Sequence, residues 1–432
     1  MLKAAIEAEM TEFIDIHQVM GTDGKKQVVR NGYLPARKVQ TGAGPIEVEI
    51  PRVRRRSKEP LIFTSSLVPK YIERLKPYKA GKPIDELKRE KGFKKIVKLA
   101  SNENPLGPSK KAINRVQKIL NSTHRYPDSN GYDLRVKLAD TFDLDMSNVI
   151  IGGGSEGIMS VIMRTFLHGN DEIIATENSF IGFRVLANAS GFKVNWVPMQ
   201  DYHYNLDAMA DKINENTKVI YLANPDNPTG TYFNKKDFDS FMGSVPDRVI
   251  VLLDEAYFEY ACHIDKYPDS MHYRYDNVIT LRTFSKAHGL AGFRVGYGFA
   301  DQKLIESLMK VKLPFEPSSL GQAAACAAMD DKEHLIDSIK INNTEKIKLE
   351  VFLKSININC IPSVTNFITI IFENKILASD FCLSLLEKGV ILRNLDSFGL
   401  PNCVRITVGT PKENNFLIEC IKEVGVANVY DR

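Results

Sequence analysis

Short apolar runs of strand length alternate with helix-length segments along the middle of the chain. Such alternation predicts a mostly parallel sheet that is covered by helices on both of its faces. The runs and the segments that follow them come in pairs: 148–151 before 156–167, 172–175 before 180–190, and 193–197 before 206–213. In a sheet of this kind, ligands bind beyond the carboxyl ends of the strands. A functional site is therefore expected in the loops that follow the apolar runs.

Two further apolar runs lead into loops that carry polar side chains. The run 218–222 precedes a loop rich in Pro, Asn and Gly that contains Asn227, and the run 249–253 precedes Asp254 and Tyr257. An isolated Asp after a strand most often caps a loop. A carboxylate in this position is also suited to pair with a protonated pyridine nitrogen, the interaction that makes pyridoxal phosphate an electron sink.

A third loop, residues 283–294, places Lys286 beside Ser285, with glycines behind it and Arg294 eight positions further on. Lysine amines form Schiff bases with carbonyls, and Ser285, Arg294 and backbone amides are donors for a phosphate. One cluster of this type is usually a solvated loop. Because polar residues follow three strand-like runs in succession, the three loops together favour a site for an aldehyde cofactor that carries a phosphate.

A fourth loop contains three consecutive glycines, residues 152–154, followed by Ser155 where a helix pattern opens. Glycines let the backbone approach an anion closely, and the amides of a helix start are donors for it. An ordinary tight turn is the alternative interpretation. The loop adds a second candidate for holding the phosphate.

Motifs along the rest of the chain resemble those of fold-type I pyridoxal-phosphate aminotransferases, and most closely histidinol-phosphate aminotransferases. Beside the loops above, they are Leu-Ala-Ser-Asn-Glu-Asn-Pro-Leu-Gly at 99–107, Arg-Tyr-Pro-Asp at 125–128 and Arg-Ile-Thr-Val-Gly at 405–409. The resemblance runs from about Pro77 to near the C-terminus. It implies an α/β fold with a large sheet domain at 146–338, a small α+β domain at 339–432, and residues 77–145 as an N-terminal arm and part of the small domain.

The resemblance also implies the cofactor, pyridoxal 5'-phosphate, and the roles of the residues that bind it. Lys286 would carry the cofactor and then move the proton between the substrate carbon and the cofactor carbon. Asp254 would keep the pyridine nitrogen protonated. The expected cofactor-binding residues are Lys286, Ser155, Glu156, Phe180, Asn227, Asp254, Tyr257, Ser285, Arg294 and, from the second subunit of a homodimer with shared sites, Tyr126.

Three departures from the pattern of that family leave roles open, and a fourth is Phe183, which stands where a tyrosine is frequent. Glu156 stands where the family usually has Asp, and Gly157 stands where Glu is common. Asn178 replaces the usual proline of the motif that contains Phe180, the aromatic expected to stack on the pyridine ring. The roles of Glu156, Gly157 and Asn178 are therefore not given by the resemblance.

Two arginines near the C-terminus are candidates for binding the substrate. A guanidinium suits a carboxylate or a phosphate equally well, and Arg393 or Arg405 taken singly is typical of a surface ion pair. By resemblance both face the substrate anion, together with Tyr78 and Asn102. That anion is the substrate phosphate in histidinol-phosphate enzymes and the α-carboxylate in aromatic aminotransferases, and the sequence leaves the two open.

The function favoured by these residues is transamination between L-histidinol phosphate and 2-oxoglutarate, giving imidazole-acetol phosphate and L-glutamate in histidine biosynthesis. An aromatic amino-acid aminotransferase or a phosphothreonine decarboxylase would share every cofactor residue. Further alternatives are a transcriptional regulator with a pyridoxal-phosphate domain and an inactive gene fusion. Turnover of histidinol phosphate separates the first function from the others.

Composition fits a cytoplasmic enzyme. The six cysteines contain no Cys-x-x-Cys pair and no His/Cys cluster at the spacing of metal ligands, so reduced thiols and no metal site are expected. No apolar run reaches the roughly 18 residues of a membrane span. Residues 1–76 hold 14 Lys or Arg against 9 Asp or Glu, whereas the remaining residues hold 43 against 44. The net charge of +4 therefore comes from the N-terminal segment.

This N-terminal segment, residues 1–76, differs in character from the rest of the chain. Residues 1–20 have the pattern of an amphipathic helix, and 42–51 that of a turn followed by a strand. The stretches 30–35, 41–45 and 51–54 resemble the N-terminal part of Mutator-type bacterial transposases, and the resemblance stops near Lys76. We expect a transposase-like leader fragment joined to an aminotransferase. The densest basic run of the segment, residues 52–58, is typical of a solvated arm, with DNA binding as the less favoured interpretation.

Overall fold

The chain divides into two units in the computed structural model. One comprises Met1–Leu75 and the other Lys76–Arg432. The structure describes residues 2–16, 28–41, 44–55, 68–77, 81–93, 95–270 and 275–425. None of the helices within these ranges is both long enough and apolar enough to cross a membrane.

The N-terminal unit consists of short helices and two antiparallel strand pairs. Its elements are α1 (Leu2–Ile16), β1 (Val28–Tyr33) paired with β4 (Pro51–Arg55), β2 (Arg37–Thr41) paired with β3 (Gly44–Val48), and α2 (Lys70–Glu73). Buried apolar side chains of α1 and of the segment around β4 form a small core: Ile6, Met10, Val48, Ile50 and Val53. The amphipathic pattern at the start of the chain is explained by this burial of one face of α1.

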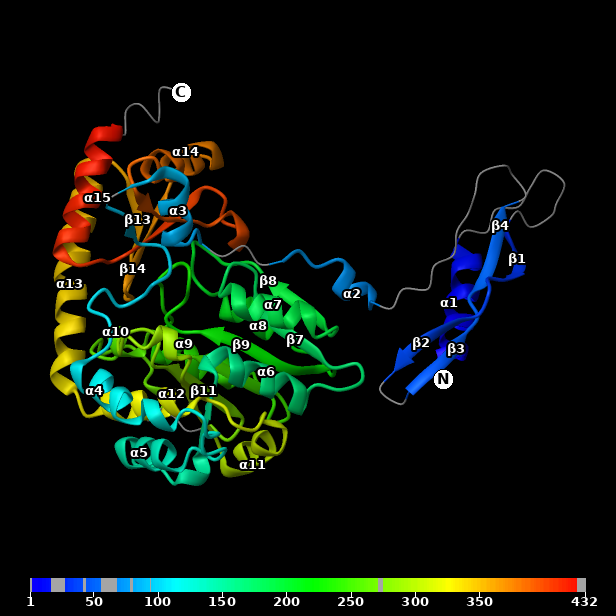
Figure 1. The fold of residues 1–432 in the computed structure, drawn as a ribbon. Coiled ribbons are helices and arrows are strands. Elements are labelled where there is room, and N and C mark those ends of the chain that lie inside the picture. The colour runs from blue at the N-terminus through cyan, green and yellow to red at the C-terminus, as the bar shows by residue number, and fades with distance from the viewer. Residues whose placement is uncertain are drawn as a thin grey trace. The chain divides into compact units, whose positions relative to one another are not determined.

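A seven-stranded sheet forms the centre of the second unit (Figure 1). Its strands in spatial order are β6 (Val149–Gly152), β12 (Gly296–Phe299), β11 (Val278–Thr283), β10 (Ile250–Asp254), β9 (Thr217–Ala223), β7 (Glu172–Thr176) and β8 (Lys193–Val197). Only β12 runs antiparallel to its neighbours, β6 and β11, among these strands. The mostly parallel sheet predicted from the sequence is confirmed.

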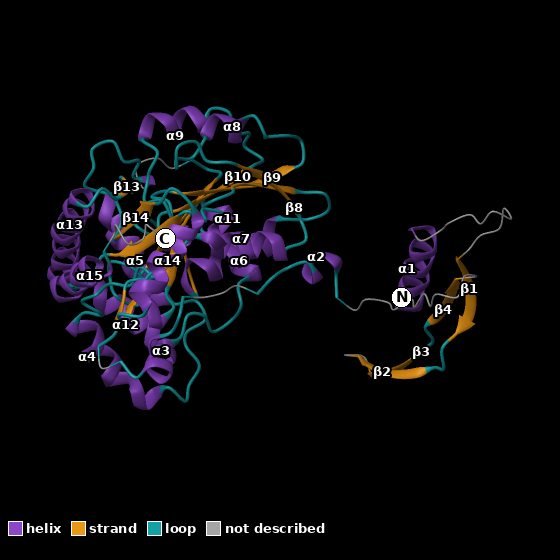
Figure 2. Cartoon of the chain, turned by 90° about the horizontal axis from the view of Figure 1, so that it is seen from above, coloured by secondary structure: helices purple, strands orange, loops and turns teal. Residues whose placement is uncertain are grey.

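Helices cover both faces of this sheet. Figure 2 shows α8 and α9 on one side of the strands and α6 and α7 on the other. The helices are α4 (Lys110–Ile119), α5 (Tyr132–Phe142), α6 (Gly154–Phe166), α7 (Ile181–Ala189), α8 (Leu206–Ala210), α9 (Lys235–Met242), α10 (Phe258–Ala261), α11 (Gln302–Val311) and α12 (Ser319–Met329). Ile150 packs with residues of α6, α7 and α11, whereas its neighbour Ile151 packs with residues of α4, α5 and α12. The strands read as uninterrupted apolar runs because both of their faces are buried.

The C-terminal part of the unit is a smaller antiparallel sheet with three helices. Its strands in order are β13 (Asn359–Ile361), β14 (Phe367–Ile371), β17 (Cys403–Thr407) and β16 (Arg393–Asn394), and its helices are α13 (Lys332–Ser355), α14 (Lys375–Leu386) and α15 (Pro411–Val424). Helix α15 begins with a capping box, in which the Thr410 hydroxyl accepts from the Glu413 amide and the Glu413 carboxylate accepts from the Thr410 amide. This reciprocal pair satisfies two backbone donors at the helix start.

The segment that precedes α4 runs between the two sheets. Helix α3 (Ile84–Lys91) packs Leu87 against Ile391, and β5 (Val97–Lys98) pairs in parallel with β15 (Val390–Ile391). Beyond β5, the side-chain amide of Asn104 donates to the backbone oxygen of Ala287, 2.8 Å away. The segment therefore starts within the small sheet region and reaches the loop that carries Lys286.

Candidate active site

The carboxyl ends of β6, β9, β10 and β11 meet at one edge of the large sheet, because these strands run in the same direction. A pocket at this edge is lined by Ser155, Glu156, Phe180, Ala223, Pro225, Asn227, Asp254, Ala256, Tyr257, Thr283, Ser285, Lys286 and Arg294. Nine of the ten expected cofactor-binding residues are among them, and Tyr126 is the exception. Phe180 follows β7, so five loops that are distant in sequence contribute to one pocket.

Asp254 is the buried carboxylate of this pocket. The Tyr221 hydroxyl donates to its Oδ2 over 2.9 Å, and the Ala256 amide donates to its Oδ1 over 3.2 Å. Burial raises the pKa of Asp254 to about 7, although both hydrogen bonds and the charge of Lys286 act in the opposite direction. A cationic group bound beside Asp254 would restore the ionised form, because an opposite charge favours it.

Lys286 follows β11 and is half-buried, with its Nζ 5.4 Å from the centre of the Tyr257 ring. The Tyr257 hydroxyl accepts a hydrogen bond from the Asn102 side-chain amide over 2.8 Å. An amide nitrogen can only donate, so the hydroxyl proton of Tyr257 is free to be donated into the pocket. Lys286 and Tyr257 therefore offer an amine and a hydroxyl donor within the same space.

An anion-binding end of the pocket is formed by the start of α6 and by Arg294. Gly154 has a φ of +77°, and a Cβ at this position would lie 2.6 Å from Nη2 of Arg294. Arg294 Nη1 donates to the Ser285 hydroxyl over 3.4 Å, and Ser155 follows in the first turn of α6. The free helix amides, two hydroxyls and a guanidinium are the donors that a phosphate dianion requires.

Glu156 adds a negative charge to this end of the pocket. Its Oε2 lies 3.3 Å from Nη2 of Arg294, and both side chains are about half exposed. An exposed pair of this kind contributes little to stability. Glu156 is therefore positioned to orient Arg294, and it provides no donor for an anion.

The two C-terminal arginines lie side by side in the small sheet. Arg393 of β16 pairs with Arg405 of β17 across the strands, and both side chains are more than nine-tenths buried. Arg405 donates to the side-chain oxygen of Asn227 and, over 3.0 Å, to the backbone oxygen of Ala100. Since Asn227 lines the pocket, Arg405 connects the small sheet to the cofactor end of the site.

Asn102 bonds residues of both the small sheet and the pocket. Its backbone amide donates to the Thr407 hydroxyl over 2.9 Å, and its side chain bonds both that hydroxyl and Tyr257. Asn102 therefore links the strand that carries Arg405 to the pocket. Tyr78, the other residue expected to bind the substrate, lies outside the described residues.

Tyr126 does not line the pocket of its own chain. Its side chain is 80% exposed, and its ring stacks on Phe315 with the ring centroids 4.3 Å apart. Three other large apolar side chains close to these residues in sequence are also exposed: Leu120, Tyr132 and Leu313. Exposed aromatic and aliphatic groups of this kind favour a protein interface.

The sequence did not single out several residues that support the site. Tyr221 on β9 holds Asp254, and the Thr283 hydroxyl accepts from the Ser285 amide over 3.1 Å. Glu255 and Arg282, which flank the functional positions of β10 and β11, form a fully buried ion pair at 2.8 Å. The sequence did contain a signal for two of them, because Tyr221 and Arg282 are polar side chains inside otherwise apolar strands.

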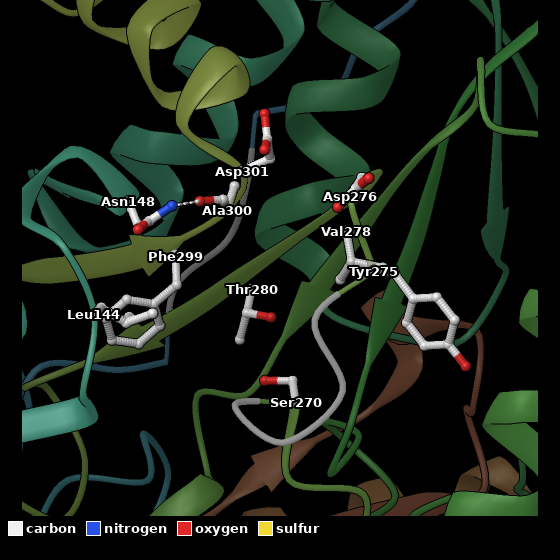
Figure 3. A pocket seen from close by; sticks show the side chains of 10 residues that line it. All are labelled: Leu144, Asn148, Ser270, Tyr275, Asp276, Val278, Thr280, Phe299, Ala300 and Asp301. Carbon is white, nitrogen blue, oxygen red and sulfur yellow. Dashed lines mark hydrogen bonds between the residues drawn. The ribbon is translucent and has the colours of Figure 1, made fainter.

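A second pocket lies near the opposite edge of the large sheet, between the start of β11 and the end of β12 (Figure 3). It is lined by Leu144, Asn148, Ser270, Tyr275, Asp276, Val278, Thr280, Phe299, Ala300 and Asp301. None of the expected site residues is among them. Within the described ranges, no three His, Cys, Asp or Glu side chains are grouped as metal ligands would be.

Comparison with known proteins identifies two families in the chain. Residues 94–421 match the family described as Aminotransferase class I and II, and residues 1–69 match the family described as Transposase, Mutator family. The second match agrees with the transposase-like character predicted for the N-terminal segment.

Curated relatives and solved structures agree with the larger match. Histidinol-phosphate aminotransferase 2 of Pseudomonas fluorescens is 40% identical over 357 residues, which cover 82% of this chain and 96% of the relative. The histidinol-phosphate aminotransferase of Bacillus subtilis subsp. natto is 39% identical, with 83% and 99% covered. A crystal structure of histidinol-phosphate aminotransferase from Sinorhizobium meliloti in complex with pyridoxal-5'-phosphate superposes with a TM-score of 0.77 at 26% identity, covering 84% of this chain and 99% of that one. The chain belongs to the class I and II aminotransferase family.

Proposed function

We propose that the second unit is a pyridoxal-phosphate-dependent transaminase that converts L-histidinol phosphate and 2-oxoglutarate to imidazole-acetol phosphate and L-glutamate in histidine biosynthesis. The names of the relatives support this substrate. The observation that carries the proposal is the arrangement of the pocket, in which Lys286, the buried Asp254 and an anion-binding helix start adjoin two buried arginines.

The residues of the pocket fit pyridoxal phosphate. Burial destabilises the charge of Asp254 in the structure, and a protonated ring nitrogen would compensate for it. Arg294 and the glycine-rich start of α6 match the phosphate, and the hydroxyl proton of Tyr257 is available to the ring oxygen. The lysine expected to hold the aldehyde, Lys286, lines the same pocket. When bound, the cofactor supplies an electron sink for the carbanion that forms at the substrate carbon.

The chain's own side chains then perform the proton transfers. With the cofactor bound, Lys286 would act as the base that takes the proton from the substrate carbon and delivers it to the cofactor carbon. Asp254 would keep a proton on the ring nitrogen, since its burial strengthens its pairing with a cation. Asn227 and Tyr257 would donate hydrogen bonds to the ring oxygen, and Phe180 would pack on the ring face. These roles are the ones expected from the sequence, and substitutions at Lys286 and Asp254 test them.

The substrate anion would be bound by Arg393 and Arg405, with Asn102 beside them. The same pair suits a phosphate or a carboxylate, so an aromatic aminotransferase and a phosphothreonine decarboxylase remain the alternatives. Steady-state turnover by the purified protein distinguishes them. We expect kcat/KM for histidinol phosphate to exceed that for phenylalanine, and no release of carbon dioxide from phosphothreonine.

Arg405→Lys should impair substrate use far more than cofactor binding. A lysine ammonium cannot reproduce the two bonds that Arg405 makes to Asn227 and Ala100 while facing an anion. Each lost charge-assisted bond costs about 1.5 to 3 kcal/mol, so KM should rise roughly tenfold to a hundredfold. Arg248→Lys is a matched control, because the Arg248 guanidinium also donates to two oxygens, the backbone oxygens of Thr217 and Asn214, but does not line the pocket. Equal losses of cofactor and substrate affinity would indicate a structural role for Arg405.

We further propose a homodimer in which Tyr126 of each subunit reaches the cofactor phosphate of the other. The strong exposure of Tyr126 and its absence from the lining of its own pocket support this arrangement.

Two further expectations from the sequence stay predictions: the division of the second unit at residues 145 and 338, and a cytoplasmic location. The free state of all six cysteines supports the location.

The N-terminal segment should be dispensable for fold and catalysis. Residues 1–75 form a separate compact unit with a core of its own, and they contribute none of the pocket residues. Protein that begins at residue 76 should therefore keep its cofactor absorption and turnover. Absorption spectra and initial rates of the truncated protein and of the full chain, measured under the same conditions, test this. Loss of folding or activity on truncation would mean that the segment has become part of the enzyme.

The same pair of proteins tests the remaining alternatives. If the basic segment binds DNA, the full chain should retard duplex DNA in a salt-dependent way that the truncated protein does not. Turnover by the full chain would exclude an inactive fusion. We expect turnover by both and no retardation by either.

A further inference from the structure

The loop between β7 and α7 contacts the small sheet region beside the two arginines. The side-chain amide of Asn178 donates a hydrogen bond to the backbone oxygen of Phe398 over 2.9 Å, across 220 positions of sequence. Phe398 ends the turn 396–398, a short 3-10 helix between β16 and β17. The proline expected at this position from the family pattern has no side-chain donor, so this contact depends on the departure at Asn178.

The surroundings of this hydrogen bond are tightly packed. Gly399 has a φ of +78°, and a Cβ there would lie 2.6 Å from Nδ2 of Asn178. Apolar residues from both sides of the contact form one cluster around Phe398: Ile181 and Tyr202 beside β7 and β8, and Leu395, Leu400 and Cys403 beside β16 and β17. Asp201 and Tyr202 adopt φ values of +48° and +64°, a strained backbone that persists only where packing imposes it. The turn is therefore held at a defined distance from the β7–α7 loop.

The turn in its place supports both arginines. The Phe398 ring centre lies 5.5 Å from Cζ of Arg393 and 5.7 Å from Cζ of Arg405, within the range of cation–π contacts. Arg393 Nη2 also donates to the hydroxyl of Ser397 in the same turn, over 3.3 Å. A displacement of the turn would consequently displace both guanidinium groups.

We propose that Asn178 is a positioning residue for substrate recognition, whose amide holds the turn 396–398 so that Arg393 and Arg405 face the substrate anion together. The inference rests on the proposed function, which assigns the arginine pair to that anion. Small errors in the placement of binding groups have large kinetic costs. Asn178 is not among the residues that line the pocket, and its side-chain amide bonds the turn, so its loss should affect substrate affinity and leave cofactor binding intact.

Two substitutions in the full-length holoenzyme test this role. Asn178→Asp keeps the size of the side chain and replaces the donor with an acceptor, and Asn178→Ala removes the group without adding charge. Both should raise KM for histidinol phosphate about tenfold, equivalent to about 1.4 kcal/mol. We expect kcat to stay within about twofold, a split that a general loss of stability does not produce. The visible absorption of the bound cofactor should be unchanged.

Asn148→Asp provides a matched control. Its half-buried side-chain amide also donates to a single backbone oxygen, that of Ala300, over 3.0 Å (Figure 3). Asn148 lies near the opposite edge of the large sheet, in the second pocket, whose lining includes no expected site residue. This substitution removes a comparable hydrogen bond, and it should leave KM unchanged.

Two measurements that need no turnover separate this inference from the proposed function. Affinity of the holoenzyme for inorganic phosphate, measured by calorimetry, should weaken about tenfold in both Asn178 variants. The amides of Phe398, Gly399 and Leu400, which bond within the turn, should exchange hydrogen faster. Wild-type protein that fails to use histidinol phosphate would refute the proposed function, and phosphate affinity would then decide the inference. Unchanged phosphate affinity and unchanged KM in the two variants would overturn it.

Discussion

Replacing Lys286 with alanine should abolish transamination and remove the visible absorption of the purified holoenzyme. Lys286 is the lysine of the pocket that also contains Asp254 and the anion-binding start of α6. Its loss removes both the covalent attachment of the cofactor and the base that moves the proton. General acid–base catalysis alone contributes about 10² to 10⁴-fold, so turnover should fall by at least about 10⁴-fold when both roles are lost. Absorption spectra and initial rates measure the two effects.

Lys303→Ala serves as the control for that substitution. Lys303 is exposed at the start of α11 and does not line the pocket. Its replacement should leave spectrum and rate unchanged. An unaltered visible band in Lys286→Ala would show that the cofactor is attached elsewhere, or is not attached.

Asp254→Asn should slow the proton-transfer step and leave cofactor binding partly intact. The asparagine keeps the size of the side chain but cannot stabilise a cationic ring nitrogen. Breaking a buried ion pair by removing one charge costs about 3 to 5 kcal/mol, which corresponds to a loss of rate of roughly 150-fold to 5,000-fold if it applies to the transition state. Rates with an α-deuterated amino donor should show a larger isotope effect than in the wild type. Near-normal turnover would exclude Asp254 as the partner of the ring nitrogen.

Cofactor-free protein offers an independent measurement on the same variant. Burial raises the pKa of Asp254 from 3.8 to about 7, so the folded state holds this proton more tightly than the unfolded state does. The free energy of unfolding should therefore contain a contribution that is complete below about pH 4 and is lost as the pH rises through about 7. Asp254→Asn removes this contribution, and its stability relative to wild type should be greater at pH 8 than at pH 5. An equal difference at both values would mean that Asp254 is not desolvated.

Other buried groups affect both proteins equally and cancel in that comparison. Burial also raises the pKa of Asp226 to about 6 and that of Glu259 to about 7, which adds to the same trend. Burial lowers the pKa of His288 to about 4, which acts in the opposite direction between that value and 6.5. The difference between variant and wild type is therefore the quantity to measure.

Most of the large sheet could be predicted from the sequence because its signals are local. Burial of both faces makes each strand an apolar run, and the expected run 148–151 corresponds to β6 at Val149–Gly152. Parallel strands end at the same edge, so the residues that follow them, such as Asp254 and Lys286, could be expected to meet without knowledge of their distances. The roles themselves came from resemblance to a family.

Contacts between distant parts of the chain could not be predicted in this way. Asn102 and Tyr257 are 155 positions apart, and Arg405 and Asn227 are 178 apart. No periodic pattern relates such residues, because their distance depends on how two sheets pack against each other. The hydrogen bond between Asn178 and Phe398 is another contact of this kind. The sequence showed that Asn178 departs from the family pattern, but it did not show the contact with Phe398.

The sequence by itself determined the strand and helix periods, the order of the loops around the sheet and the foreign character of the N-terminal segment, since each is written in neighbouring residues. Only the tertiary structure decided which groups share a hydrogen bond and which charges are buried. Whether Asp254 is charged depends on the desolvation imposed by its surroundings and on the Tyr221 hydroxyl from the adjacent strand. Desolvation and hydrogen bonding act over a few ångströms in space, and these distances are set by packing.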